Sequence, residues 1–189
     1  MIDVAPDPIH TKRLVLYPLR LEHSGPMWEV LREPDIYTWF PREPPQTPAD
    51  LENRFRVITQ GRSDDGLELW FNWMIWDREN KRAVGLVEAT ARTDGSVGIA
   101  YMIRPSLWRC RYGYEAVAAV IDVLFSGKAT VVEAEIDTRN HASLGLVAAL
   151  GFSLVEQRVA IEWFKGAWSD EELWRLTPQQ WAAHKTHSD

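Results

Sequence analysis

One segment of this chain could bind an anion at the start of a helix. Tyr101 to Arg104 resembles the end of a β-strand, Pro105 interrupts it, and an arginine-rich loop leads into an apolar helix ending near Phe125. The first backbone N–H groups of a helix lack intrahelical partners and point along the helix axis. A pyrophosphate would fit there, so the segment predicts a phosphate-binding loop.

A second polar pair precedes another short helical stretch. Asn140 and Ser143 stand at its start, and it ends at Leu150-Gly151-Phe152. Both residue types suit a helix N-terminus, where a side-chain oxygen accepts a hydrogen bond from a free backbone N–H. Capping and ligand binding are compatible roles, so the sequence leaves both open.

Together the two segments resemble the GNAT acetyltransferase superfamily, in its RimJ/RimL-like branch of ribosomal-protein N-terminal acetyltransferases. That branch typically has the motif Pro-x-x-Trp-Gly-x-Gly-Tyr-Ala-x-Glu-Ala in its pyrophosphate loop. The chain matches it at Pro105, Trp108, Tyr112, Glu115 and Ala116, with Gly113 in the alanine position. The resemblance covers nearly the whole chain apart from its tail.

The loop departs from the family motif at both glycines, which are Arg109 and Arg111 here. Glycine tolerates positive φ and lets the backbone approach a phosphate closely. One interpretation is that the guanidinium groups bind phosphate in place of backbone amides. A second is that they face another phosphorylated donor, an acyl carrier protein or an aminoacyl-tRNA, and a third is that the site has decayed and both arginines are solvated.

The resemblance also implies roles for individual residues. Asn140 would contact the pantetheine arm, and Ser143 would protonate the departing thiolate. Many GNAT enzymes place a tyrosine for that purpose where this chain has Val147, and the RimL-like branch is proposed to use the serine instead. The cofactor-binding residues implied are Met102, Ile103, Arg104, Arg109, Cys110, Arg111, Tyr112, Gly113, Tyr114, Asn140 and Ser143.

Glu162 is the candidate general base. It lies in the stretch from Val159 to Asp170, which resembles the late hairpin of the branch, and its spacing after Ser143 also matches. An amine must lose a proton before it attacks a thioester, and a carboxylate desolvated among aromatic residues accepts one readily. A glutamate on an alternating strand more often faces water. Glu88, Glu133 and Glu135 are weaker alternatives.

Tryptophan is abundant, with 10 in the chain. If the family layout holds, Trp39, Trp70, Trp73, Trp76, Trp163 and Trp168 fall on the acceptor side, where indole rings could stack on a flat or cationic molecule. The alternative is that most are core or interface residues. The predicted acceptor-binding residues are Trp39, Trp73, Glu88, Trp163 and Trp168.

Composition indicates a globular enzyme of 189 residues, with 46% hydrophobic and 25% charged residues. The net charge of −6 argues against broad nucleic-acid binding. The five His lack metal-ligand spacing, so we expect no metal, and no apolar run is long enough for a membrane span. The lone Cys110 cannot form an internal disulfide, which fits a reducing cytoplasm.

The expected fold is α+β: a mixed, mostly antiparallel GNAT sheet of about seven strands, flanked by helices and splayed between its fourth and fifth strands. Residues 1–176 would form one domain, and 177–189 a helical appendage or oligomer contact. Expected strands are Leu14 to Pro18, Leu69 to Asp77, Arg82 to Arg92, Val97 to Ile103, Val131 to Asp137 and the late hairpin. Expected helices are Leu21 to Arg32, Thr47 to about Gln60, Tyr112 to Phe125, and His141 to Leu150.

The sequence therefore predicts a cytoplasmic N-acyltransferase that moves an acetyl group from acetyl-CoA, or another phosphopantetheine thioester, to a primary amine of a small molecule or peptide. One alternative is a non-CoA donor, an acyl carrier protein or aminoacyl-tRNA, in the biosynthesis of a specialised metabolite such as an antibiotic. Another is a non-catalytic ligand-binding protein. A homodimer is compatible with the composition, and no membrane partner is expected.

Overall fold

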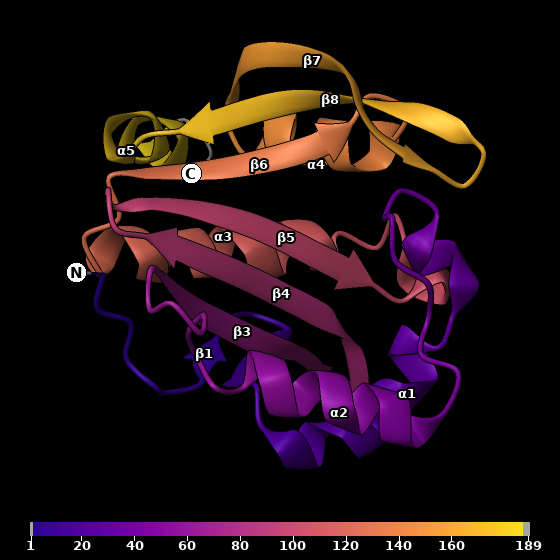
Figure 1. Cartoon of the computed structure of the whole chain (residues 1–189). Helices are drawn as coiled ribbons and strands as arrows, with labels where there is room; N and C mark the ends of the chain where they lie inside the picture. Colours follow the sequence, from indigo (N-terminus) through magenta and orange to yellow (C-terminus); the bar gives the residue numbers. More distant parts are fainter. Residues whose placement is uncertain (1, 187–189) are drawn as a thin grey trace.

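The computed structural model describes residues 2–186 and contains one open sheet with helices on both faces (Figure 1). The sheet has 8 strands in the order β1-β2-β3-β4-β5-β6-β8-β7, all antiparallel except the β5–β6 pair. This confirms the predicted fold class. The elements are β1 (Ile9–His10), β2 (Leu14–Pro18), η1 (Leu21–His23), α1 (Ser24–Leu31), η2 (Pro34–Tyr37), α2 (Pro48–Ile58), β3 (Glu68–Asp77), β4 (Arg82–Arg92), β5 (Ser96–Ile103), η3 (Pro105–Leu107), α3 (Tyr112–Ser126), β6 (Val131–Asp137), α4 (His141–Ala149), β7 (Ser153–Phe164), β8 (Ala167–Leu176) and α5 (Pro178–Thr186).

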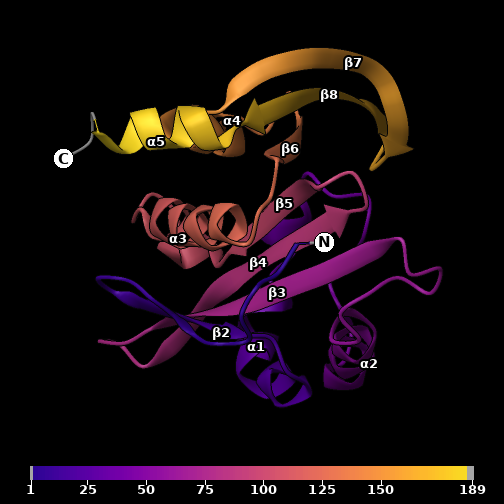
Figure 2. The same ribbon diagram turned by 90° about the vertical axis from the view of Figure 1, so that its left-hand side faces the viewer.

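Two hydrophobic cores lie on opposite faces of the sheet (Figure 2). The larger core packs one face of the strands against α3, α4 and α5, and the smaller core packs the other face against α1 and α2. Alternation along β4 sends neighbouring side chains to different cores: Val87 joins the larger one, and Leu86 the smaller one. The strands are therefore apolar on both faces wherever helices cover them.

The strands β5 and β6 separate soon after they meet. Their parallel pairing covers only Ser96↔Val131, Val97↔Val132 and Gly98↔Glu133, after which β6 continues to Asp137 paired with β8 alone. Backbone groups on the facing edge of β5 beyond Gly98 therefore have no strand partner on that side. A ligand with amide groups could pair with such an edge.

The predicted strands and helices are present, with two differences in extent. The stretch expected as one helix from Leu21 divides into η1 and α1. The late hairpin is longer than predicted, because β7 begins at Ser153, and its register with β8 shifts twice, with Ala160 at φ 52° inside the second shift. These shifts are β-bulges, which bend the strand and interrupt its ladder.

The C-terminal helix α5 is part of the main core. Trp181 is only 5% exposed and packs in the larger core, and its indole Nε1 donates to Asp122 Oδ1 of α3 at 2.8 Å. We expected an appendage because the segment lies beyond the usual end of the resembled family. The buried indole corrects that expectation for residues 178–186, while 187–189 lie outside the described residues.

Replacing Trp181 by Ala should destabilise the fold by about 3–5 kcal/mol, because it leaves a large cavity and removes the indole hydrogen bond to Asp122. Trp163→Ala is the matched control: that indole is 58% exposed, so about 1 kcal/mol or less is expected. Urea unfolding followed by circular dichroism measures both. Equal losses would contradict the placement of α5 in the core.

Candidate active site

The N-terminus of α3 has no side-chain cap. Its N-cap, Arg111, makes no side-chain hydrogen bond to the helix. In contrast, Thr47 caps α2 and Asn140 caps α4, each accepting a hydrogen bond from a backbone N–H in the first turn. The helix α1 also lacks a side-chain cap, but it continues directly from η1, whereas α3 begins after a loop. The first N–H groups of α3 are therefore open to an external anion, and the helix dipole favours negative charge there.

The two arginines of the loop adopt the backbone conformation that glycine would supply. Arg109 has φ 59° and Arg111 has φ 62°, and both residues are exposed. A left-handed non-glycine residue costs about 1–2 kcal/mol, so the loop holds its shape against a local preference. The positive φ angles are therefore present although both glycines are absent.

Arg13, the residue directly before β2, holds this loop in place. Its Nη1 donates to the Cys110 carbonyl at 3.0 Å, its Nε donates to Glu115 Oε2 at 2.6 Å, and its guanidinium stacks over the Tyr112 ring at 4.5 Å. The hydrogen bond and ion pair with Glu115 raise the pKa of Arg13, so it stays charged. Cys110 itself is exposed and free.

Gly113 lets α3 approach its neighbours closely. A Cβ atom there would lie 3.0 Å from Leu146 Cδ1 and 3.5 Å from Ile103 Cγ1. The position therefore joins the start of α3, the end of β5 and α4, which are the three elements around the strand separation.

Ser143 is in the first turn of α4, beside the separation between β5 and β6. Its backbone N–H donates to Asn140 Oδ1 at 3.2 Å. Asn140 is therefore the cap of α4, which is one of the two roles predicted for it. Tyr101 of β5 donates its hydroxyl to the Ser143 carbonyl at 3.3 Å, across the separation. Burial raises the pKa of Tyr101 to about 12, so the Tyr101 hydroxyl is protonated at neutral pH.

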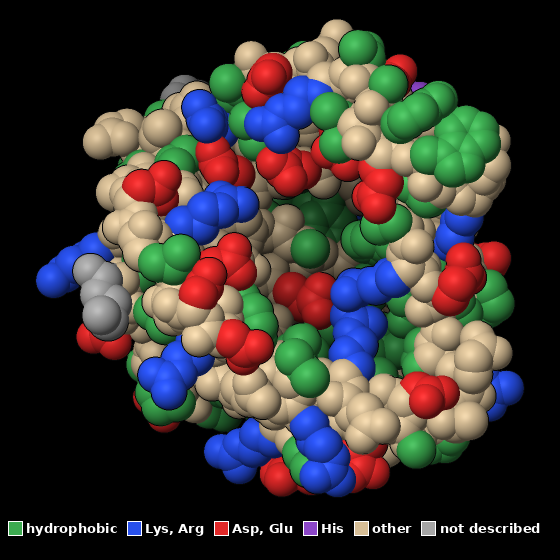
Figure 3. Space-filling view, in the orientation of Figure 1, with side chains coloured by type: hydrophobic (Ala, Val, Ile, Leu, Met, Phe, Trp, Pro, Cys, Tyr) green, Lys and Arg blue, Asp and Glu red, His purple; other side chains and the backbone are tan. Residues whose placement is uncertain are grey.

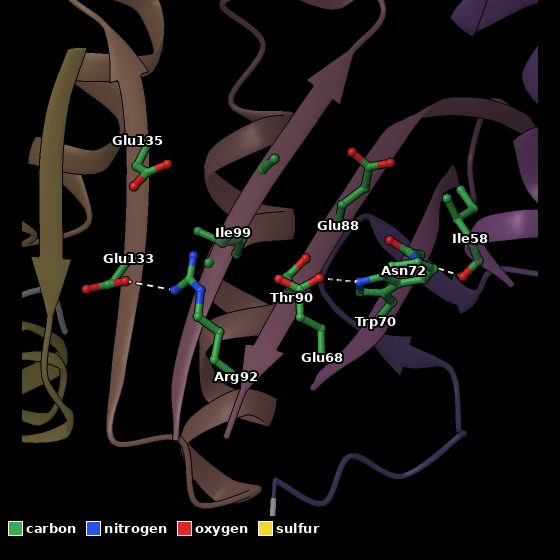
Figure 4. A pocket seen from close by; sticks show the side chains of 12 residues that line it. Ile58, Glu68, Trp70, Asn72, Glu88, Thr90, Arg92, Ile99, Glu133 and Glu135 are labelled. Atoms are coloured by element: carbon green, nitrogen blue, oxygen red, sulfur yellow. Dashed lines mark hydrogen bonds and ion pairs between the residues drawn. The ribbon is translucent and has the colours of Figure 1, made fainter. Parts of the chain in front are cut away.

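A cavity of about 440 Å³ opens on the opposite face of the sheet. Figure 3 shows the hollow from outside, and Figure 4 shows that strands β3, β4 and β6 all send side chains toward it. Its polar lining residues are Glu68, Trp70, Asn72, Glu88, Thr90, Arg92, Glu133 and Glu135. The cavity is next to the separation between β5 and β6, because Gly98, Ile99 and Ala100 also line it.

Glu88 is at the floor of this cavity and is held by two cations. Arg54 Nη2 of α2 lies 2.9 Å from its Oε1, and Arg42 Nη2 lies 3.3 Å from its Oε2. Arg42 also has a buried Nε without a partner among the described residues. Glu88 thus joins α2 and the loop before it to β4, which makes it a positioning residue at the site.

Glu162 lies on the same face of the β7–β8 hairpin as Ser169. It is directly opposite Ser169 on β8, whose hydroxyl donates to Asp137 Oδ2 at 2.9 Å, and cross-strand partners point the same way. Glu162 is exposed and makes no ion pair within residues 2–186. Burial, and then repulsion from Glu135, raises the pKa of the neighbouring Glu171.

Asp137 and Arg139 connect the end of β6 to the surrounding loops. Arg139 Nε and Nη2 donate to the two Asp137 oxygens at 2.8 and 2.5 Å, and its guanidinium lies 5.1 Å from the Trp39 ring centre and 5.8 Å from that of Phe164. Burial alone would raise the pKa of Asp137. Hydrogen bonds from Arg139 and Ser169 outweigh it and hold the pKa below its ordinary value of 3.8.

With this geometry in view, the comparison with known families is decisive. A family model described as an acetyltransferase (GNAT) domain matches residues 13–153. The chain belongs to the GNAT acetyltransferase family. The family prediction is confirmed, and the chain is a GNAT N-acyltransferase, a family that uses acetyl-CoA.

Solved structures of other GNAT proteins share this fold at low identity. A GCN5-related N-acetyltransferase from Brucella melitensis is 18% identical, with a TM-score of 0.81 over 96% of this chain and 83% of that chain. A ribosomal-protein-S5-alanine acetyltransferase from Vibrio fischeri is 17% identical, with a TM-score of 0.78 over 93% and 98%. A spermidine N-acetyltransferase from Vibrio cholerae, in complex with CoA and spermine, is 16% identical, with a TM-score of 0.76 over 91% and 99%. No curated protein sequence matches the chain.

Several residues predicted for the GNAT site lie elsewhere. Trp73 is 2% exposed in the larger core, stacked on Phe71, because its place in β3 points it away from the cavity. Trp163 and Trp168 form an edge-to-face pair and are 58% and 56% exposed, on the side of the hairpin opposite Glu162. We therefore leave these three tryptophans out of the proposed acceptor site.

Two predicted cofactor-binding residues have other partners. Arg104 Nε lies 2.9 Å from Glu33 Oε1, which holds the guanidinium beside α1. The Met102 side chain is 2% exposed in the smaller core. At both positions only the backbone remains near the separation.

The Ile103 carbonyl accepts a hydrogen bond from Trp108 Nε1 at 2.7 Å, and the Tyr114 hydroxyl lies 3.4 Å from His184 Nε2.

The prediction from sequence included only part of the polar lining of this cavity: Glu88 and Trp70 were named for the acceptor side, whereas Asn72 and Thr90 were missed. Trp70 and Asn72 on β3 alternate with apolar residues, as do Glu88 and Thr90 on β4. This period of two places each pair on one face of its strand, and it was the signal that could have found Asn72 and Thr90. Arg42 and Arg54 come from a loop and a helix, so no local pattern connects them to Glu88.

No helix among residues 2–186 is both long and apolar enough to cross a membrane. In the same part of the chain, no group of three or more His, Cys, Asp or Glu side chains is arranged to hold a metal ion.

Replacing Asp137 by Asn should lower the free energy of unfolding by about 2–3 kcal/mol at pH 7, because Arg139 and Ser169 lose a charged acceptor. The folded-state pKa of Asp137 lies below 3.8, so its contribution is present above that pH and is lost as the pH falls through the folded value. Urea unfolding at pH 7 and pH 3 checks this. The difference between parent and variant should shrink at pH 3, and a constant difference would contradict the assignment.

Replacing Arg109 and Arg111 together by Gly should leave stability unchanged or higher, because relief of left-handed strain offsets the greater entropy of unfolded glycine. Affinity for CoA should fall about tenfold or more, because each charge-assisted hydrogen bond is worth about 1.5–3 kcal/mol. Calorimetric titration measures the affinity.

Lys128→Gly is the control for this pair, since Lys128 is exposed, has φ 71° and lies at the far end of α3. It should relieve similar strain without changing CoA affinity. Tighter CoA binding by the arginine double variant would show that the arginines obstruct the cradle.

Proposed function

We propose that the chain transfers an acetyl group from acetyl-CoA to the primary amine of a small molecule or peptide, by direct attack. The observation that supports this best is the separation of β5 and β6 beside the uncapped N-terminus of α3. The helix end fits a pyrophosphate, and the free edge of β5 fits the amide groups of a pantetheine arm. The thioester would then reach the cavity on the opposite face.

The acceptor would enter through that cavity. Its volume of about 440 Å³ fits a small amine or the end of a peptide, and Trp70 offers an aromatic surface. Glu88 would hold the wall of the cavity in shape through Arg42 and Arg54. The exposed Glu162 has no cation to displace within the described residues, which suits a group that must take up a proton.

In the proposed reaction, Glu162 takes a proton from the ammonium group, directly or through a water molecule. The amine nitrogen attacks the thioester carbonyl carbon, and β5 N–H groups near Ile103 stabilise the oxyanion. The C–S bond then breaks, and the hydroxyl of Ser143 protonates the thiolate. The nitrogen loses its second proton as the amide forms, and this proton, passed through water, restores the Ser143 hydroxyl. Tyr101 is close enough to Ser143 to hold its turn of α4 in place during this step.

Glu162→Gln should lower kcat by about 100-fold or more with little change in KM, since general-base catalysis contributes about 10²–10⁴-fold. Steady-state kinetics between pH 6 and 9 with a panel of primary amines, following CoA release, measures this. Glu156→Gln is the matched control, because Glu156 is also exposed on β7 but pairs with Arg158. Equal activity of Glu162→Gln and the parent across this pH range would remove Glu162 from the mechanism.

A further inference from the structure

Most Lys and Arg side chains of this chain form ion pairs, and those that do not are unevenly distributed. Within residues 2–186, the Lys and Arg side chains without a carboxylate oxygen within 4.0 Å are Lys12, Arg62, Arg78, Lys81, Arg109, Arg111 and Lys128. All of them are exposed. Five of these seven, all except Arg62 and Lys128, belong to segments around the N-terminus of α3. We call these five the basic surface.

Hydrogen bonds connect the segments that carry the basic surface. Arg78 donates to the backbone carbonyls of Thr11 and Lys12, and its own backbone N–H donates to the Arg13 carbonyl at 3.1 Å. Arg13 in turn donates to Cys110, between Arg109 and Arg111. Lys81 is in the same turn as Arg78, between β3 and β4. The five cations therefore occupy adjoining segments.

The nearby carboxylates leave most of this charge uncompensated. Asp77 is buried and accepts a hydrogen bond from the Tyr112 hydroxyl at 2.7 Å, and Glu115 is paired with Arg13. Glu79 is exposed in the same turn as Arg78 and Lys81. The region is thus positive, although the whole chain has a net charge of −6. Such local asymmetry favours an acidic partner.

An anchored aromatic residue borders the basic surface. Trp108 is 49% exposed, yet its Nε1 donates to the Ile103 carbonyl at 2.7 Å, so the ring is held in one position. Rigid tryptophan and arginine side chains are the residues most enriched at the energetic centres of protein interfaces. A small phosphorylated molecule in the cradle needs only the loop itself, whereas Lys12, Arg78 and Lys81 extend beyond it.

We propose that the basic surface and Trp108 form a docking site for an acidic carrier protein that bears a phosphopantetheine thioester. The inference rests on the proposed function, because carrier proteins and CoA share the phosphopantetheine arm that would enter between β5 and β6. The thioester chemistry is unchanged: the amide forms, the C–S bond breaks, and the thiol stays on the carrier. The basic surface would in addition bind the carrier protein to which the phosphopantetheine arm is attached. A long polyanion such as tRNA is disfavoured by the net charge of −6 on the whole chain, because the surface outside the five cations is acidic.

The test compares two double charge reversals. Lys12→Glu with Lys81→Glu changes the basic surface, and Arg62→Glu with Lys128→Glu makes the same change in net charge elsewhere. Each pair includes one lysine at positive φ, Lys81 at 50° and Lys128 at 71°, so backbone effects are matched. Binding of holo acyl carrier protein is measured by biolayer interferometry, and binding of free CoA by calorimetry.

We expect the basic-surface variant to weaken carrier binding about tenfold or more while the control stays within about twofold of the parent. CoA affinity should stay within about twofold for both variants. Equal weakening by the two variants, no carrier binding by the parent, or preferential binding of tRNA would overturn the proposal. If the parent protein does not bind CoA, that result would instead count against the proposed acetyl-CoA function.

Discussion

The geometry of the site depends on how briefly β5 and β6 pair. Three register positions hold the two halves of the sheet together, and β6 then pairs only with β8. A parallel pair that continued would satisfy the backbone of both strands and close the sheet. Because it stops, the uncapped end of α3, the Ser143 turn of α4 and the cavity beside Glu88 all border one opening. In the proposed function, the donor and the acceptor approach this opening from opposite faces.

Arg109 and Arg111 show that a backbone shape can persist when the residues that favour it do not. Their positive φ values keep the loop in the form that two glycines would give, held by Arg13, Glu115 and the Tyr112–Asp77 hydrogen bond. Strain of this kind persists where the surroundings determine the backbone more strongly than the residue does. The loop thus combines a left-handed backbone with two exposed guanidinium groups.

Sequence patterns were sufficient for the fold and for the loop, because both depend on local signals. Pro48 after Thr47 predicted the start of α2, and the motif from Pro105 to Ala116 predicted the loop that leads into α3. The acceptor side was predicted less well. Trp73 and Trp163 were chosen for residue type, but strand register decides which face each residue occupies. The contacts of Glu88 with Arg42 and Arg54 join segments far apart in the chain, so no periodicity indicates them.

The bulges of β7 have a consequence for solubility. β7 is one of the two edge strands of the sheet, and Val155, Val159 and Ile161 are exposed along it at 49%, 76% and 48%. A straight apolar edge of this kind would template another strand and promote aggregation. The two register shifts, with Ala160 in the left-handed region, break the regular row of N–H and C=O groups that an added strand needs. The kinked edge therefore protects the enzyme from polymerising through its own sheet.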